Sequence, residues 1–115
     1  MSYDPTLLYE WISVSLYQNP SLSLEELSQE LSVSRRTIQN TVIAIAGKKF
    51  RDLRKELLLA IFQSALVAEP AAAIKELSSE IGYASPRSFA RAIRCACGVS
   101  PEQLRALIAG DLFGS

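Results

Sequence analysis

The stretch GYASPRSFARAIRCACGVSP, residues 82–101, decides the fold of this chain. Its pattern predicts a turn, one helix over residues 85–97, and a stop. Ser85 can cap the helix through its hydroxyl, and Pro86 suits the first helical position, where no backbone N–H is needed. Gly98 can adopt the left-handed conformation that ends many helices.

This predicted helix has two different faces. A stripe with helical spacing, predicted to face the core, comprises Phe89, Ile93 and Cys97. A basic stripe on another side comprises Arg87, Arg91 and Arg94. The chain has no acidic residue between Glu80 and Glu102. A helix held by one face, with arginines on the other, suits recognition of an anionic partner.

A similar pattern occurs earlier in the chain. Residues 26–31, ELSQEL, align with residues 76–81, ELSSEI, at an offset of 50. One extra residue in the following turn makes the offset 51, and Ser34 then aligns with Ser85. Two amphipathic helix pairs can look alike by chance, but the capping serine, the core positions and the terminal glycine all keep register. The sequence therefore predicts an internal repeat of a helix-turn-helix.

Composition limits the class of protein. The chain has 115 residues, of which 49% are apolar, enough for one domain or two small subdomains with a core. We find no signal peptide and no apolar run long enough to span a bilayer, which predicts a cytoplasmic protein without membrane association. The two cysteines are one residue apart and the chain has no histidine, so neither a disulfide nor a metal site is predicted.

The charges are segregated, although the net charge is zero. Ten of the twelve Lys and Arg lie in residues 33–55 and 84–98, and these windows hold one of the twelve acids, Asp52. Ordinary solvated helix faces are one interpretation. Segregation in step with the repeat favours the other interpretation, an electrostatic footprint for a nucleic acid.

Hydrophobic periodicity and cap signals predict an all-α fold with seven helices. The expected ranges are 5–18, 23–31, 34–46, 51–68, 71–81, 85–97 and 101–110. We expect Trp11 and Ile45 to face the core, and Gly110 to end the last helix. The predicted division is a first helix-turn-helix subdomain over 5–50, a linker helix over 51–69, and a second helix-turn-helix subdomain over 70–110.

The linker helix is apolar nearly all round from Leu57 to Ala68. The flanking bundles can cover much of it. If an apolar strip stays exposed there, it is expected to contact a second copy of the chain or an effector domain. The alternative is that the first and last helices bury it within one chain. Ile43 is predicted to face outward from the helix over 34–46.

The first turns of the helix over 34–46 are expected to expose side chains that suit DNA: Arg35, Arg36, Gln39 and Asn40. Arginine can donate two hydrogen bonds to guanine, and Gln or Asn can pair with the edge of adenine. A generic polar surface fits the same residues. The chain contains no histidine, no phosphate-binding P-loop and no Gly-rich dinucleotide turn, so no enzyme activity and no cofactor are predicted.

These features resemble the DNA-binding domain of the AraC/XylS family of bacterial transcription regulators, from about Leu7 to Leu107. The most specific part is GYxSPxSFxRxIR over residues 82–94, followed by GVSPxxxR over residues 98–105. The first half of the chain matches the family more weakly, through residues 22–34 and the GKxF pattern at 47–50.

The resemblance implies two helix-turn-helix units held by a long linker helix, with the helices over 34–46 and 85–97 in successive major grooves of double-stranded DNA. By position, it implies base contacts from Arg36, Gln39, Asn40, Pro86, Arg87, Ala90 and Arg91. It implies backbone contacts or caps from Ser34, Arg35, Ser85, Ser88 and Arg94.

The chain departs from the family pattern in three places. Ile43 and Ala44 stand where members often have basic residues, Cys95 stands where a second basic residue often follows Arg94, and the linker is far more apolar. Members usually carry a separate effector or dimerisation domain. The predicted function is sequence-specific binding of double-stranded DNA by a transcription regulator. The alternative is a degenerate helix-turn-helix module that acts as a protein-interaction or dimerisation unit.

Overall fold

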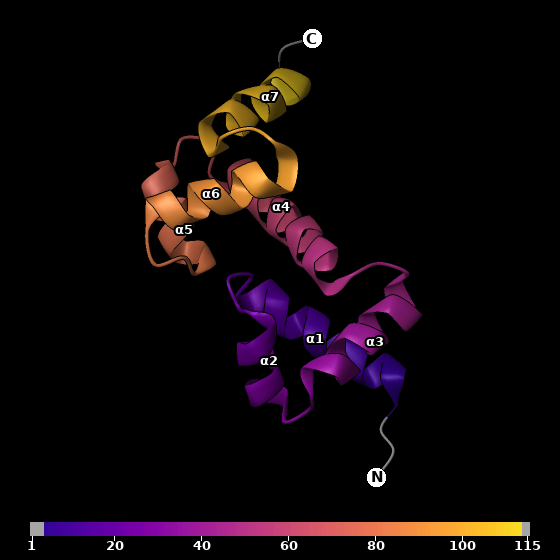
Figure 1. Ribbon diagram of the computed structural model, residues 1–115. Coiled ribbons are helices and arrows are strands. Elements are labelled where there is room, and N and C mark those ends of the chain that lie inside the picture. The colour runs from indigo at the N-terminus through magenta and orange to yellow at the C-terminus, as the bar shows by residue number, and fades with distance from the viewer. Residues whose placement is uncertain (1–3, 114–115) are drawn as a thin grey trace. The chain divides into compact units, whose positions relative to one another are not determined.

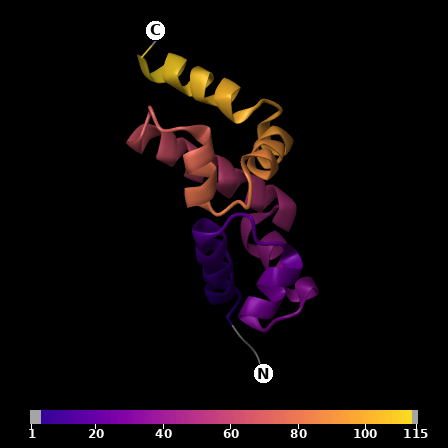
Figure 2. The same ribbon diagram turned by 90° about the vertical axis from the view of Figure 1, so that its left-hand side faces the viewer.

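The computed structural model describes residues 4–113, which form α-helices and no strand. The seven helices are α1 (Pro5–Gln18), α2 (Leu24–Leu31), α3 (Arg35–Ala46), α4 (Phe50–Ala68), α5 (Ile74–Ile81), α6 (Pro86–Cys97) and α7 (Pro101–Phe113). The predicted all-α fold is confirmed. The chain divides into two compact units, Met1–Leu57 and Leu58–Ser115, and the boundary lies inside α4. Figure 1 and Figure 2 show the helices of each unit gathered together, α1 to α3 in the first and α5 to α7 in the second.

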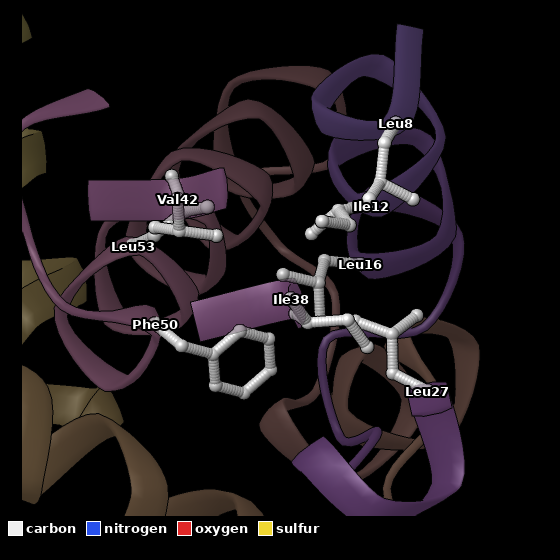
Figure 3. Close-up of a cluster of buried hydrophobic side chains, with 8 residues drawn as sticks. All are labelled: Leu8, Ile12, Leu16, Leu27, Ile38, Val42, Phe50 and Leu53. Atoms are coloured by element: carbon white, nitrogen blue, oxygen red, sulfur yellow. The ribbon is translucent and has the colours of Figure 1, made fainter. Parts of the chain in front are cut away.

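The core of the first unit lies between α1, α2, α3 and the first turns of α4. Buried positions on α1 recur every four residues and face buried side chains of α3, and Figure 3 shows Leu16 beside Ile38 at the centre. The buried set is Leu8, Ile12, Leu16, Leu27, Ile38, Val42, Phe50 and Leu53. Burial of this apolar surface is the main force that holds the three-helix bundle together.

The second unit repeats this plan with the rest of α4. Its buried set is Leu58, Phe62, Leu66, Leu77, Ile81, Phe89 and Ile93. The Phe89 ring is fully buried and meets two other rings edge to face. The centroid distances are 5.1 Å to Phe62 and 5.4 Å to Tyr83. Such pairs add to the gain from apolar burial, so Phe89 is the centre of this core.

The apolar composition of α4 follows from its place in both cores. Its first turn contributes Phe50 and Leu53 to the first unit, and later turns contribute Leu58, Phe62 and Leu66 to the second. Among the large hydrophobic side chains of α4, Val67 is the one that is mostly exposed, at 57%. The run from Leu57 to Ala68 therefore supplies core side chains on one side, while the other side keeps an exposed stripe of Ala60, Gln63, Ser64, Val67 and Ala68.

Three side chains predicted to face the core are exposed. Trp11 is 53% exposed because it lies about 100° around α1 from Ile12, outside the covered face. Ile45 is 43% exposed because it lies in the last turn of α3, beyond the level at which Val42 is buried. Cys97 is exposed at the end of α6, where its thiol donates to the Ile93 carbonyl at 3.3 Å.

Two predicted helix boundaries are wrong. α5 begins at Ile74 and not at residue 71, because residues 69–72 form a turn in which the Ala72 N–H donates to the Glu69 carbonyl at 3.1 Å. α7 continues through Gly110 to Phe113. Glycine lowers helix propensity by about 1 kcal/mol but ends a helix only where the backbone turns left-handed, which Gly110 does not do.

The caps of α3 and α6 confirm the predicted repeat. The Ser34 hydroxyl accepts a hydrogen bond from the Thr37 N–H, and the Ser85 hydroxyl accepts one from the Ser88 N–H, both at 3.1 Å. Both helices end on a glycine with positive φ, 70° in α3 and 84° in α6. The two units therefore hold equivalent helices, each with a serine at its N-cap and a left-handed glycine at its C-cap.

The repeat is broken at one cap. At the start of α2 the Ser23 hydroxyl accepts from the Glu26 N–H at 3.0 Å, and the Ser23 N–H donates to the Glu26 carboxylate at 2.9 Å. The bond from the Ser23 N–H, and after it the interaction with the Ser23 hydroxyl, lower the pKa of the Glu26 carboxyl. The equivalent cap position of α5 is Ala73, which makes no side-chain bond, although Glu76 is present three residues later.

We expect Ala73→Ser to stabilise the second unit by about 0.5–1 kcal/mol, because it would complete the same capping box with Glu76. Urea denaturation followed by circular dichroism measures the change. Ala71→Ser, in the preceding turn, is the matched control and should leave the midpoint unchanged. An unchanged or lower midpoint for Ala73→Ser would contradict the equivalence of the two caps.

Candidate nucleic-acid interface

The outer face of α3 carries the side chains predicted for the first unit. Arg35 and Arg36 lie in its first turn, Gln39 and Asn40 in its second, and all four are exposed. They lie away from Ile38 and Val42, which are fully buried on the other side. The Ser34 hydroxyl is also exposed, and it serves as the cap.

A hollow of about 530 Å³ lies beside this face. Its lining combines polar, apolar and cationic side chains: Leu24, Gln39, Asn40, Ile43, Lys49, Phe50, Arg51 and Arg54. The fold thus brings two of the predicted base-contacting residues next to the cations at the start of α4. Ile43 faces outward, as predicted, and forms part of the same wall.

Two of the nearby cations already have protein partners. The Arg54 guanidinium donates from Nη1 to the Leu22 carbonyl at 3.0 Å and lies 6.0 Å from the centre of the Phe50 ring. Lys48 is paired with Glu56, and this hydrogen bond raises the pKa of the Lys48 ammonium. Lys49 and Arg51 are the exposed cations of the hollow.

The outer face of α6 is built in the same way. Ser85 and Ser88 hold the helix start by reciprocal bonds, with the Ser85 N–H donating to the Ser88 hydroxyl at 3.3 Å. Pro86 occupies the first helical position, as predicted. The exposed side chains that follow are Arg87, Arg91 and Arg94, with Ala90 half-buried among them.

Two hollows flank this face. One, of about 370 Å³, is lined by Arg87, Ala90, Arg91, Arg94 and Cys95. The other, of about 420 Å³, is lined by Ile74, Lys75, Pro86, Arg87, Ala90, Ser100, Pro101 and Glu102. Arg87 and Ala90 line both hollows, so they form the ridge between them. Such a ridge with arginines on it suits insertion into a groove lined by acceptors.

Sequence reasoning missed one pair of residues that hold these faces in place. Arg105 of α7 donates from Nη1 to the Ala72 carbonyl, just as Arg54 of α4 donates to the Leu22 carbonyl. Each arginine thus ties a later helix to the loop before the first helix of its helix-turn-helix. The signal was present, because Arg54 and Arg105 are 51 residues apart, the offset of the repeat.

The described residues hold neither a metal-binding group nor a membrane-spanning helix. Within residues 4–113, no group of three or more His, Cys, Asp or Glu side chains is placed to hold a metal ion. None of the helices described is long and apolar enough to cross a membrane.

Comparison with known proteins gives a consistent result. Residues 27–107 match a family model described as a helix-turn-helix domain. The fold is similar to the C-terminal domain of AraT, a response regulator from Geobacillus stearothermophilus, with 23% identity over 90% of this chain and 84% of that one and a TM-score of 0.70. It is also similar to a DNA-binding transcriptional dual regulator from Escherichia coli K-12, with 18% identity over 85% of this chain and 88% of that one and a TM-score of 0.61.

No curated protein matches the sequence significantly. The solved structures, at these identities, establish the fold alone. The family model covers well over half of the chain, including both helix-turn-helix units. The chain therefore belongs to the AraC-type helix-turn-helix family.

Proposed function

We propose that this chain binds double-stranded DNA sequence-specifically, as the DNA-binding part of a bacterial transcription regulator, with α3 and α6 in successive major grooves. One observation carries the proposal. Each unit presents a capped helix whose outer face carries exposed arginines, lacks acidic residues and adjoins a hollow. Family membership and a structural neighbour described as a DNA-binding regulator support the same function.

By their positions in the family pattern, the side chains divide into two proposed roles. Those proposed to contact base edges are Arg36, Gln39, Asn40, Pro86, Arg87, Ala90 and Arg91. Arg35 and Arg94 are proposed to contact phosphates, which position a protein on the duplex without selecting sequence. The Ser34, Ser85 and Ser88 hydroxyls are engaged in the caps. Their contribution is to fix the two helix starts, whose N–H groups favour an anion such as phosphate.

Selection from a pool of random duplexes tests the proposal. The expected result is an enriched motif of two short blocks, whose centres are separated by about one duplex turn, roughly 10 base pairs. A motif with a single block would contradict the binding of both units in successive grooves. No enrichment above the starting pool would contradict sequence-specific binding itself.

We expect a modest salt dependence of DNA affinity. Each phosphate contact contributes a slope of about −0.9 in log K against log salt. Several cations are missing or already paired in this chain, since Ile43, Ala44 and Cys95 replace basic residues of the family pattern and Arg54 donates to Leu22. Fluorescence anisotropy between about 50 and 200 mM salt should give a slope shallower than about −5. A slope near −9 would contradict this count of phosphate contacts.

A second candidate function is contact with a second copy or an effector domain through α4. The observation that favours it is the exposed Val67 side chain. Light scattering over a concentration series tests it, with Val67→Glu as the comparison. A mass increase that the substitution removes would support the contact, and a constant monomer mass would contradict self-association through α4.

A further inference from the structure

α1 carries an exposed apolar face in addition to the face that it buries. Its exposed fractions are 42% for Leu7, 53% for Trp11, 54% for Val14 and 56% for Tyr17. Leu7, Trp11 and Val14 recur at i, i+4 and i+7, so they form one seam along the helix, and Tyr17 lies beside it one turn later. We call these four residues the α1 seam.

Neither the core nor the proposed DNA interface accounts for the α1 seam. The core uses the other side of α1, where Ile12 and Leu16 are fully buried. None of the residues proposed to contact DNA lies on α1. The seam exposes roughly 400 Å² of apolar and aromatic surface, on the basis that a large aromatic side chain presents about 150–250 Å². A patch of this size is comparable to the largest apolar patch on a typical monomeric protein, and such patches often serve a function.

The charge around the α1 seam indicates its partner. Residues 1–34, which include α1 and α2, contain no Lys or Arg. They contain five acids: Asp4, Glu10, Glu25, Glu26 and Glu30. Glu10 is exposed on α1 and is the helical neighbour of Leu7 and Val14, at spacings of three and four residues. The charged side chains of α1 and its cap, Asp4 and Glu10, are therefore both acidic, and Lys48, which interacts with Tyr9 of α1, is already paired with Glu56.

We propose that the α1 seam docks an amphipathic helix of another protein, whose apolar face is flanked by Lys or Arg. The spacing of 4 and then 3 residues is the one by which helices pair along a narrow seam. Cations beside the partner's apolar face would lie against Asp4 and Glu10 of α1, which favours encounter and selects against acidic helices.

A second copy of this chain fits the seam less well. Pairing two α1 helices would bring together two segments that each hold five acids and no Lys or Arg. This repulsion between like charges favours a cationic partner over self-association.

The position of Trp11 provides a direct assay, because it is the only tryptophan in the chain. The probe is a synthetic 18-residue helical peptide with leucines at seam spacing and lysines on both flanks, and its matched control carries glutamates in place of the lysines. We expect the lysine peptide to shift Trp11 emission to shorter wavelength, saturably, and the glutamate peptide to bind about tenfold more weakly. High salt should narrow this difference, because exposed charges are screened.

Variants assign the binding to the seam. Val14→Glu should weaken binding of the lysine peptide at least about tenfold, because it places a charge in the middle of the apolar contact. Val67→Glu, an equally exposed valine on α4, should leave it unchanged. Tyr17→Ser repeats the test if Val14→Glu lowers the helix content measured by circular dichroism. DNA affinity should be unaffected by all three substitutions, so this inference can fail while the proposed function holds.

Three results would overturn the inference. The first is the absence of an emission change with the lysine peptide. The second is equal binding of the lysine and glutamate peptides, which would remove the argument from charge. The third is a concentration-dependent doubling of mass without peptide that Val14→Glu abolishes, which would make a second copy the occupant of the seam.

Discussion

Phe89→Ala is expected to unfold the second unit and to leave the first unit folded. The Phe89 side chain is fully buried and packs edge to face against Phe62 and Tyr83. Truncating a buried phenylalanine costs about 3–5 kcal/mol, because the transfer free energy is lost and a cavity remains. A unit of this size is marginally stable, with roughly 5 kcal/mol available, so the substitution removes most or all of it.

Two signals separate the units in this experiment. Trp11 belongs to the first unit, so its emission should stay as in the unaltered chain while the circular dichroism signal of helix falls. Hydrogen exchange should localise the loss of protection to residues after Leu58. The matched control is Ile38→Ala, because Ile38 aligns with Phe89 in the repeat and is also fully buried. It should change Trp11 emission and spare the second unit.

Loss of both units with either substitution would contradict independent folding. It would show that α4, which contributes Leu53 to one core and Leu58 to the other, couples the two units energetically. In that case the chain would unfold in a single cooperative transition, and the stability of one unit could not be assigned separately.

The sequence predicts helices and caps well where the signal is local. The Ser34 and Ser85 caps, and the glycines that end α3 and α6, were predicted from single residues whose backbone or hydroxyl acts within one helical turn. The repeat strengthened these predictions, because each capping serine and each terminal glycine recurs 51 residues later in the chain. At the start of α5 the sequence offers no capping side chain, because the cap position is Ala73, and the predicted start was accordingly misplaced by three residues.

Burial was harder to predict where a helix is apolar on more than one side. Periodicity identifies the apolar positions of α1, but it does not decide which of them another helix covers. Trp11 and Ile12 are neighbours in sequence and both are hydrophobic, yet one is 53% exposed and the other 0%. On α4 most of the large apolar side chains are covered, because both cores draw on that helix, and Val67 stays exposed.

The sequence predicts which helix faces carry the candidate interface. It does not predict which of the cationic side chains are free and which already bind another part of the protein. The spacing from Ile38 and Phe89 correctly places the arginines of α3 and α6 on exposed faces. An arginine near a helix start looks the same in sequence whether it faces solvent or donates to a distant carbonyl, as Arg54 does to Leu22, 32 residues away. Which side chains contact bases remains a prediction.

Arg91→Ala is expected to weaken specific DNA binding by about 1–3 kcal/mol, a loss of roughly 5- to 150-fold in affinity, and to relax selectivity at one or two base pairs. Arg91 is exposed in the middle of α6 and lines a hollow together with Ala90 and Arg87. A guanidinium at this position can donate two hydrogen bonds to one base, and alanine leaves those base acceptors unsatisfied.

Arg94→Ala is the matched comparison, because Arg94 lies on the same helix, is also exposed and lines the same hollow, but sits in the last turn. We expect it to weaken all duplexes alike and to reduce the salt slope by about 1, as loss of one phosphate contact does. Anisotropy titrations on the selected duplex, on its single-base variants and on a scrambled duplex measure both effects. Equal losses for Arg91→Ala on the selected and scrambled duplexes would show that Arg91 contacts phosphate, and base selection by α6 would then fall to Arg87.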